Sequence, residues 1–234
     1  MKKIIYLILV VGIIAGASWF LLEKKSSKND NQSIVTPEIS DSKNELNNSN
    51  EVNQIQNQEL APAVDEKKFQ FPLDRASERV TKKPFGIFIA PENSPVQPEK
   101  FSGYHTGADF EIFPEEENID VIIEAVCSGK LLMKKYATGY GGMAVQSCDL
   151  EGEPITVVYG HLKLDSIKVA LGDDIAIGEA LGVLGKAYSV ETSGERKHLH
   201  LGFHKGSEIN ILGYVFTKSV LSSWLDPMIF LKMK

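Results

Sequence analysis

The chain has 234 residues, of which 43% are hydrophobic and 24% are charged, and its formal net charge is −6. This length accommodates one or two domains, and two cysteines are too few for a small disulfide-stabilised framework. The acidic balance argues against nucleic acid as a partner, because a nucleic-acid-binding surface carries an excess of positive charge.

The N-terminal residues predict a segment that enters a membrane. Lys2 and Lys3 precede an uncharged apolar run over 4–22, which as a helix is long enough to cross a hydrocarbon core of about 30 Å. A cleaved signal peptide is the alternative, with a small-residue cleavage pattern at 15–17. We favour a retained anchor, because cleavage there would leave a bulky apolar end. Residues 1–25 are therefore predicted to be a transmembrane anchor or signal segment.

A polar linker is expected over 26–66. This stretch contains eight asparagines and no aromatic residue, glycine or cysteine. Such a segment buries too little apolar surface to offset its ordering entropy, so it is predicted to be disordered, with a mean reach of roughly 35 Å. The remaining residues are then held in the cell envelope outside the cytoplasm, anchored to the membrane, or secreted if the N-terminal segment is cleaved.

Residues 67–234 have the composition of one globular domain. Their apolar runs are short, rich in valine, isoleucine and aromatic residues, and separated by glycines, which is typical of strands and turns. The fold class predicted from this pattern is mainly β and antiparallel, with a short C-terminal helix over 227–232. Strands are expected at 86–90, 108–113, 121–127, 130–136, 142–147, 155–161, 182–184 and 198–204.

The histidines are concentrated in this domain, at His105, His161, His198, His200 and His204. Alternation along a strand places His198, His200 and His204 on one face, and the apolar residues between them on the other face, which is the natural core side. Two imidazoles two residues apart can converge on a metal ion, which binds the neutral form of the ring. His204 is interpreted as a structural continuation of the polar face.

A carboxylate follows the first histidine at a spacing of four. Gly107 and the alternation over 108–113 favour a loop that runs into a strand, so Asp109 points away from the apolar Ala108 and Phe110. An imidazole from His105 and a carboxylate at the head of a strand form a candidate pair of zinc ligands. A catalytic zinc site takes three protein ligands and leaves one position open. Taken singly, each of these motifs is more often structural.

Together the motifs resemble the lysostaphin-type zinc endopeptidases, which cleave peptidoglycan peptides. The resemblance rests on His105-Thr106-Gly107-Ala108-Asp109, on Tyr159-Gly160-His161-Leu162 and on His198-Leu199-His200-Leu201-Gly202-Phe203. Further similar segments lie at 84–86, 125–131, 140–142 and 171–182, so that the resemblance spans roughly 71–206.

The resemblance implies a fold, a cofactor and a set of roles. The fold is a compact antiparallel β-sheet or sandwich domain of the duplicated hybrid motif kind, with a groove across its sheet. His105, Asp109 and His200 would bind Zn²⁺. His161 and His198 would flank the metal-bound water, one taking its proton and the other holding the oxyanion or protonating the leaving amine. The implied activity is hydrolysis of stems or cross-links of peptidoglycan by a metal-activated water.

Two other functions are compatible with parts of the pattern. A non-catalytic wall-binding relative could regulate other hydrolases, but such relatives commonly lose metal or base residues, and all five positions are filled here. A carrier module would share the glycine turns of 171–182, but it needs a lysine at the tip of a hairpin, which is missing from this stretch.

Three local features keep two interpretations each, and a fourth has one. Tyr159 either shares the face of His161 and lines the groove or, as we favour, packs across strands. The charged stretch 190–197 is a solvated loop or a groove wall, and 115–117 is expected to be a solvated turn. Cys127 and Cys148 are either reduced thiols or a disulfide worth ~3 kcal/mol.

Overall fold

The computed structural model describes residues 68–232, all of which lie in one compact unit. The predicted anchor over 1–25 and the predicted linker over 26–66 lie outside the described residues, so both stay predictions. Within the described part of the chain, helices are too short or too polar to span a bilayer.

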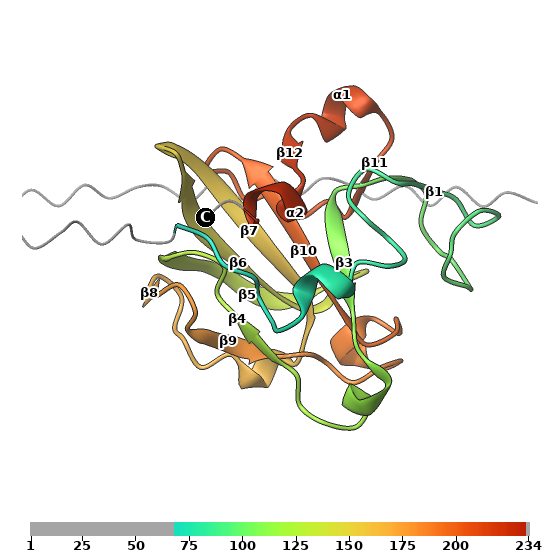
Figure 1. The fold of residues 1–234 in the computed structure, drawn as a ribbon, viewed down its shortest axis with the longest axis horizontal. Coiled ribbons are helices and arrows are strands. Elements are labelled where there is room, and N and C mark those ends of the chain that lie inside the picture. Colours follow the sequence, from blue (N-terminus) through green and yellow to red (C-terminus); the bar gives the residue numbers. More distant parts are fainter. Residues whose placement is uncertain (1–67, 233–234) are drawn as a thin grey trace, which may run out of the picture. The chain divides into compact units, whose positions relative to one another are not determined.

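The described residues form short strands and little helix, as the composition predicts (Figure 1). The strands are β1 (Phe88–Ile89), β2 (Gly103–His105), β3 (Gly107–Glu111), β4 (Ile122–Glu124), β5 (Gly129–Ala137), β6 (Gly141–Leu150), β7 (Glu153–Leu162), β8 (Asp174–Ile175), β9 (Ala180–Val183), β10 (His198–Lys205), β11 (Tyr214–Val215) and β12 (Trp224–Leu225). The helices are α1 (Lys218–Leu221) and α2 (Pro227–Phe230), and single 3₁₀ turns span Ala76–Glu78, Pro114–Glu116, Leu164–Ser166 and Val190–Thr192. All eight expected strands are present, and α2 starts where the C-terminal helix was expected.

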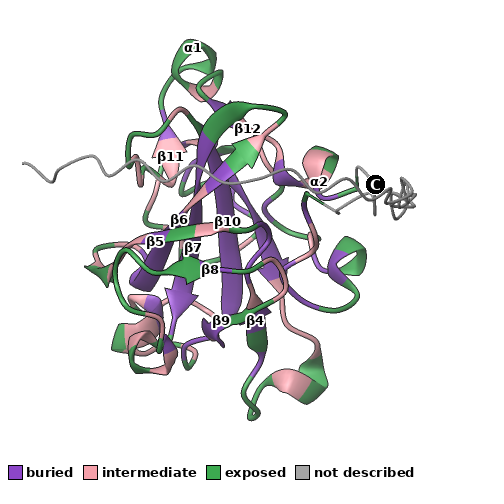
Figure 2. Ribbon diagram, turned by 90° about the vertical axis from the view of Figure 1, so that its left-hand side faces the viewer, coloured by how far each residue is buried: buried purple, intermediate pink, exposed green. Residues whose placement is uncertain are grey.

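A seven-stranded antiparallel sheet dominates the domain. Its order is β12-β10-β7-β6-β5-β8, and β3 pairs with β10 on the edge opposite β7. Two small sheets flank it, one made of β1, β2 and β11 and the other of β4 and β9. This architecture confirms the mainly β, antiparallel prediction. Figure 2 shows that the buried residues are concentrated in the central strands of the large sheet.

The core lies on one face of β10 and β7. It includes Leu199, Leu201 and Phe203, the residues that alternate with the histidines, so the predicted core face of this strand is confirmed. Tyr159 lies in the same core, where its hydroxyl donates to Gln146 Oε1 at 2.7 Å and accepts from the Val126 amide at 3.0 Å. Of the two interpretations of Tyr159, packing across strands is therefore the correct one.

The two cysteines form a disulfide between the ends of neighbouring segments. The Cα atoms of Cys127 and Cys148 are 6.0 Å apart, and both residues are buried in the core. This bond ties the segment before β5 to β6.

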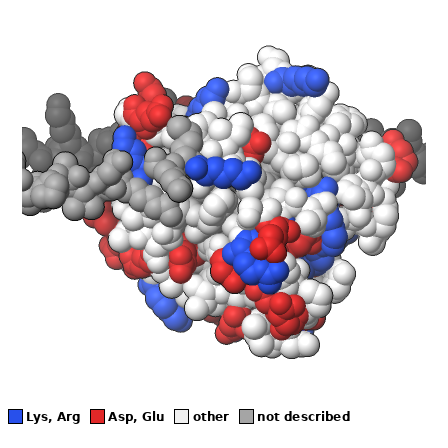
Figure 3. Space-filling view, in the orientation of Figure 1, with Lys and Arg blue, Asp and Glu red and all other residues white. Residues whose placement is uncertain are grey.

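A buried arginine fixes the segment before β3, and the expectation of a solvated turn over 115–117 is wrong for one of its residues. The Arg79 side chain is fully buried and donates to Glu116 Oε2 and to Asp74 Oδ1, both at 2.6 Å. Glu116 is held by this pair, whereas Glu115 and Glu117 are not buried. A charge run cannot reveal which of its members meets a buried counter-charge. On the face shown in Figure 3, acidic and basic side chains lie next to one another.

Candidate metal centre

The pairing of β3 with β10 brings together residues that are 91 positions apart. Asp109 lies directly opposite His200 in this antiparallel pair, and opposite residues of two strands project from the same face. His105 ends β2, two residues before β3 begins. The strands approach closely because position 107 is glycine: a Cβ atom there would collide with the Leu201 carbonyl and lie 2.8 Å from the His200 ring.

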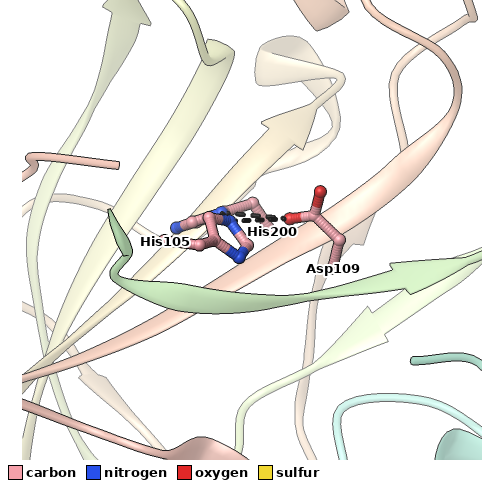
Figure 4. A group of neighbouring side chains, drawn as sticks. All are labelled: His105, Asp109 and His200. Carbon is pink, nitrogen blue, oxygen red and sulfur yellow. Dashed lines mark hydrogen bonds and ion pairs between the residues drawn. The ribbon is translucent and has the colours of Figure 1, made fainter. Parts of the chain in front are cut away.

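Three side-chain atoms from these residues form a small triangle (Figure 4). His105 Nε2 lies 3.0 Å from His200 Nδ1 and 3.3 Å from Asp109 Oδ1, and the latter two atoms are 3.2 Å apart. In a tetrahedron with metal–ligand bonds of about 2.0–2.1 Å, neighbouring ligand atoms are about 3.3–3.4 Å apart. The triangle therefore has the size of one face of a tetrahedral zinc site.

The remaining ring nitrogens have partners that leave the triangle atoms without protons. His105 Nδ1 lies 3.3 Å from the Pro84 carbonyl, which can only accept, so this nitrogen is the one placed to carry a proton and Nε2 is the one placed to bind a metal. His200 Nε2 lies 3.4 Å from Tyr140 Oη, which can accept in the same way. Burial lowers the pKa of His200 to about 4, so its ring is neutral near pH 7. A carboxylate oxygen and two nitrogen lone pairs then face one another, which is a donor set that fits a cation.

Asp109 uses its two oxygens in different directions. Oδ1 belongs to the triangle, whereas Oδ2 accepts from Arg196 Nη2 at 2.9 Å and lies 3.3 Å from His198 Nε2. Burial by itself raises the pKa of a carboxyl group, but the nearby His198 and His105 hold the pKa of Asp109 well below its usual range. Asp109 is therefore an ionised carboxylate in a buried position.

His161 reaches the site through a bulge at the end of β7. Met143 faces Gly160 and Gly142 faces Leu162, so His161 is an extra residue in the β6–β7 ladder, with φ at +63°. A bulge re-aims a side chain, and here it turns the imidazole away from the core face of Tyr159. Tyr159 and His161 therefore do not share a face, which excludes the groove-lining alternative for Tyr159.

The rings of His161 and His198 lie side by side, with centroids 4.2 Å apart. His198 Nδ1 is 2.9 Å from the Arg196 carbonyl, which fixes the orientation of this ring. His161 Nδ1 is buried and has no hydrogen-bond partner among residues 68–232. Burial, and next the neighbouring His198, hold the pKa of His161 well below its usual range, so this ring is neutral.

All five predicted site residues line one cleft of about 370 Å³. On another wall, the Tyr214 ring stacks on Phe101 with centroids 5.3 Å apart, and Lys83 Nζ donates to the Tyr214 hydroxyl at 3.1 Å. His204 lies elsewhere on β10, with its ring against Trp224 at 4.9 Å, as expected for a structural histidine.

Several cleft residues were not predicted as site residues. Tyr140 belongs to a segment noted only for its glycines, and Tyr214 lies on β11, which is too short to give a periodic signal. For the stretch 190–197 the structure supports both interpretations in different places. Glu195 and Arg196 line the cleft, whereas Val190 is exposed.

Comparisons with known proteins place this region in a described family of sequences. The model of Peptidase family M23 matches residues 103–211, a range that contains all five site residues. No curated protein matches the chain. Among solved structures, the chain is similar to cbpa from L. salivarius REN, with 22% identity, a TM-score of 0.46, and coverage of 71% of this chain and 96% of that one. LytU gives 22% identity, a TM-score of 0.43, and coverage of 65% and 83%. A chain from the SpoIIIAH–SpoIIQ complex has 17% identity and a TM-score of 0.43, and the match covers 69% of this chain and 99% of that one.

Proposed function

Residues 103–211 of this chain belong to peptidase family M23, the lysostaphin-type family that its motifs predict, and from this premise we propose that the protein is a zinc-dependent endopeptidase. Its proposed substrates are the peptide stems or cross-links of bacterial peptidoglycan. The observation that carries the proposal is the triangle of His105, Asp109 and His200, with two further imidazoles beside it in one cleft.

The metal would be held by His105 Nε2, Asp109 Oδ1 and His200 Nδ1. When bound, zinc supplies a Lewis acid that polarises a carbonyl group and lowers the pKa of water towards about 7. The chain keeps its ligands ready for this role: the Pro84 carbonyl orients the His105 ring, and Tyr140 Oη orients the His200 ring.

His161 and His198 would handle the protons of peptide hydrolysis. A neutral imidazole whose nitrogen has no other partner can accept a proton, which makes His161 the candidate general base. His198, held through Nδ1 by the Arg196 carbonyl, would stabilise the developing oxyanion or protonate the leaving amine. Burial of both rings keeps bulk water away from these transfers.

We also propose that the catalytic domain works outside the cytoplasm, in the cell envelope, held by the segment 1–25. The Cys127–Cys148 disulfide supports an oxidising compartment, because such bonds are rare in the cytosol. Cell fractionation and protease accessibility of intact cells test this location. Recovery of the protein from the cytosol with both thiols reduced would contradict it.

The activity is tested by zinc content and by digestion of purified peptidoglycan and of muropeptides of known linkage, with the new ends identified by mass spectrometry. Digestion of at least one wall by the zinc-loaded protein, lost in His200→Ala, is the expected result. Stoichiometric zinc without released peptides from any wall would instead favour the non-catalytic wall-binding alternative.

A further inference from the structure

An arginine outside the predicted site contacts the candidate metal ligand Asp109. The Arg196 side chain is only 10% exposed, and its guanidinium group lies between two carboxylates of β3. Nη2 donates to Asp109 Oδ2 at 2.9 Å. The guanidinium group also contacts both carboxylate oxygens of Glu111: Nε donates to Oε1 at 3.0 Å and to Oε2 at 2.9 Å, and Nη2 donates to Oε1 at 2.5 Å. A planar fork with several donors is suited to such a contact.

The positions of the three residues follow from the strand register. Asp109 and Glu111 are two apart on β3, so they share the face that looks towards the cleft, opposite His200 and His198 on β10. Arg196 lies in the loop directly before β10 and returns across the strand pair to reach both carboxylates. The loop therefore contributes a cation to the edge of the metal triangle.

The contact with Arg196 determines which oxygen of Asp109 faces the other two candidate ligands. With Oδ2 held by Arg196, only Oδ1 points at His105 and His200. We propose that Arg196 is a positioning residue that holds Asp109 as a ligand through one oxygen, with Glu111 as the anchor of the guanidinium group. The proposal rests on the zinc site proposed above.

Arg196 has two opposing effects on zinc binding, and their relative sizes decide whether its removal weakens or strengthens the affinity. A guanidinium charge repels a cation, but the carboxylate of Glu111 neutralises that charge at hydrogen-bond distance. Loss of a hydrogen bond that orients a ligand typically weakens metal binding or activity by about 10–100-fold. Orientation therefore outweighs repulsion, and removal of Arg196 is expected to weaken zinc binding.

The test compares the purified full-length protein with Arg196→Gln and Arg196→Lys. Lysine keeps the charge, but all three of its N–H donors sit on a single nitrogen, which cannot replace a planar fork that spans two carboxylates. Arg75→Gln is the matched control, because Arg75 also pairs with a carboxylate, that of Glu78, but at the surface and away from the cleft. Zinc affinity is measured by competition with a chromophoric chelator, and folding by thermal melting without metal.

Both Arg196 variants are expected to bind zinc at least tenfold more weakly than the wild type, and Arg75→Gln within about twofold. A second readout is the visible spectrum of the Co²⁺-loaded proteins. Release of Oδ2 lets Asp109 bind through both oxygens, and the higher coordination number weakens the absorption bands in the Arg196 variants only.

The proposal and the function beneath it fail in different ways. If wild type and Arg196→Lys bind zinc within twofold of each other and give the same Co²⁺ spectrum, Arg196 only fastens the loop, and the proposal is wrong while the zinc site stands. If the wild type binds no zinc, or if His200→Ala binds zinc as tightly as the wild type, both the metal site and the positioning role of Arg196 are wrong. Arg196→Lys retains the charge, so it decides the outcome even if Arg196→Gln fails to fold.

Discussion

Gly107→Ala is predicted to abolish zinc binding while leaving the domain folded. The new Cβ would lie 2.8 Å from two atoms of the His200 ring, whereas ordinary contacts of a Cβ begin at 3.4 Å. The ring or the strand must therefore yield by about 0.6 Å, three times the roughly 0.2 Å that metal–ligand distances tolerate. Movement of the ring alone is not enough, because the same Cβ would collide with the Leu201 carbonyl, a backbone atom of the paired strand, so β3 and β10 must also separate.

The stability cost of this substitution is that of an overpacked site, about 1–3 kcal/mol. In a domain of this size each kcal/mol lowers the melting temperature by about 2–4 °C, so the protein remains folded at 25 °C. Zinc affinity is measured by chelator competition and stability by calorimetry of the metal-free protein.

Gly152→Ala is the matched control. Gly152 lies in the turn between β6 and β7 with φ at +91°, and a Cβ there would meet no atom within 4 Å. It should lose stability through backbone strain alone and keep its zinc. If Gly107→Ala binds zinc as tightly as the wild type, the close approach of β3 and β10 does not position His200, and the reasoning from the triangle is refuted.

Three further predictions concern the ligands, an ion pair and the disulfide. His200→Ala is expected to lose zinc, whereas His161→Ala keeps zinc and loses turnover, as measured by metal analysis and peptide release. The hydrogen bond from buried Arg79 lowers the pKa of Glu116, so its stabilising contribution is full above the unfolded-state pKa of about 4.3 and is lost as the pH falls through the folded-state pKa. Glu116→Gln should therefore lose about 1–3 kcal/mol at pH 7 and flatten the acid limb of stability against pH. Reduction of the Cys127–Cys148 bond should cost ~3 kcal/mol in chemical denaturation, from the loop that it closes.

Each of these has a result that would overturn it. Wild-type turnover in His161→Ala would remove the proposed base. Glu115→Gln is the control for the acid limb, since Glu115 is exposed and 4.0 Å from its nearest cation; an equal effect there would mean that the buried pair is not responsible. Denaturation curves unchanged by reduction would show that the disulfide is not a stabilising constraint.

What the sequence could predict is what local patterns encode. The alternation of histidine with apolar residues predicted the core face of β10, because side-chain period along a strand is fixed by geometry. Four strands of two or three residues, β2, β8, β11 and β12, were missed because so few residues show no periodicity. The face of His161 was left open for a related reason: a bulge breaks the period, and the bulge depends on the pairing of β7 with β6.

Arg196 was harder to predict, since its role depends on partners 85 and 87 positions earlier in the chain. In sequence, a charged stretch before a strand resembles a solvated loop. Only the pairing of β3 with β10 places two carboxylates beneath it. A functional charge of this kind is visible only once the register is known.

The backbone positions the site residues in two ways, by strand pairing and by a β-bulge, and mutations that disturb each should have different effects. Asp109 and His200 occupy opposite positions of one strand pair, so changes that alter the spacing of β3 and β10 act on the metal first. His161 sits on a bulge in a left-handed conformation, where its backbone amide donates to Tyr140 and its carbonyl accepts from Gly185. Changes in the Gly185 segment should redirect the proton acceptor and lower turnover while zinc stays bound, whereas changes at Tyr140 also reach the metal ligand His200. Metal affinity and the proton-acceptor role of His161 are therefore separable in this fold, because the β3–β10 pair holds Asp109 and His200, whereas the bulge between β6 and β7 holds His161.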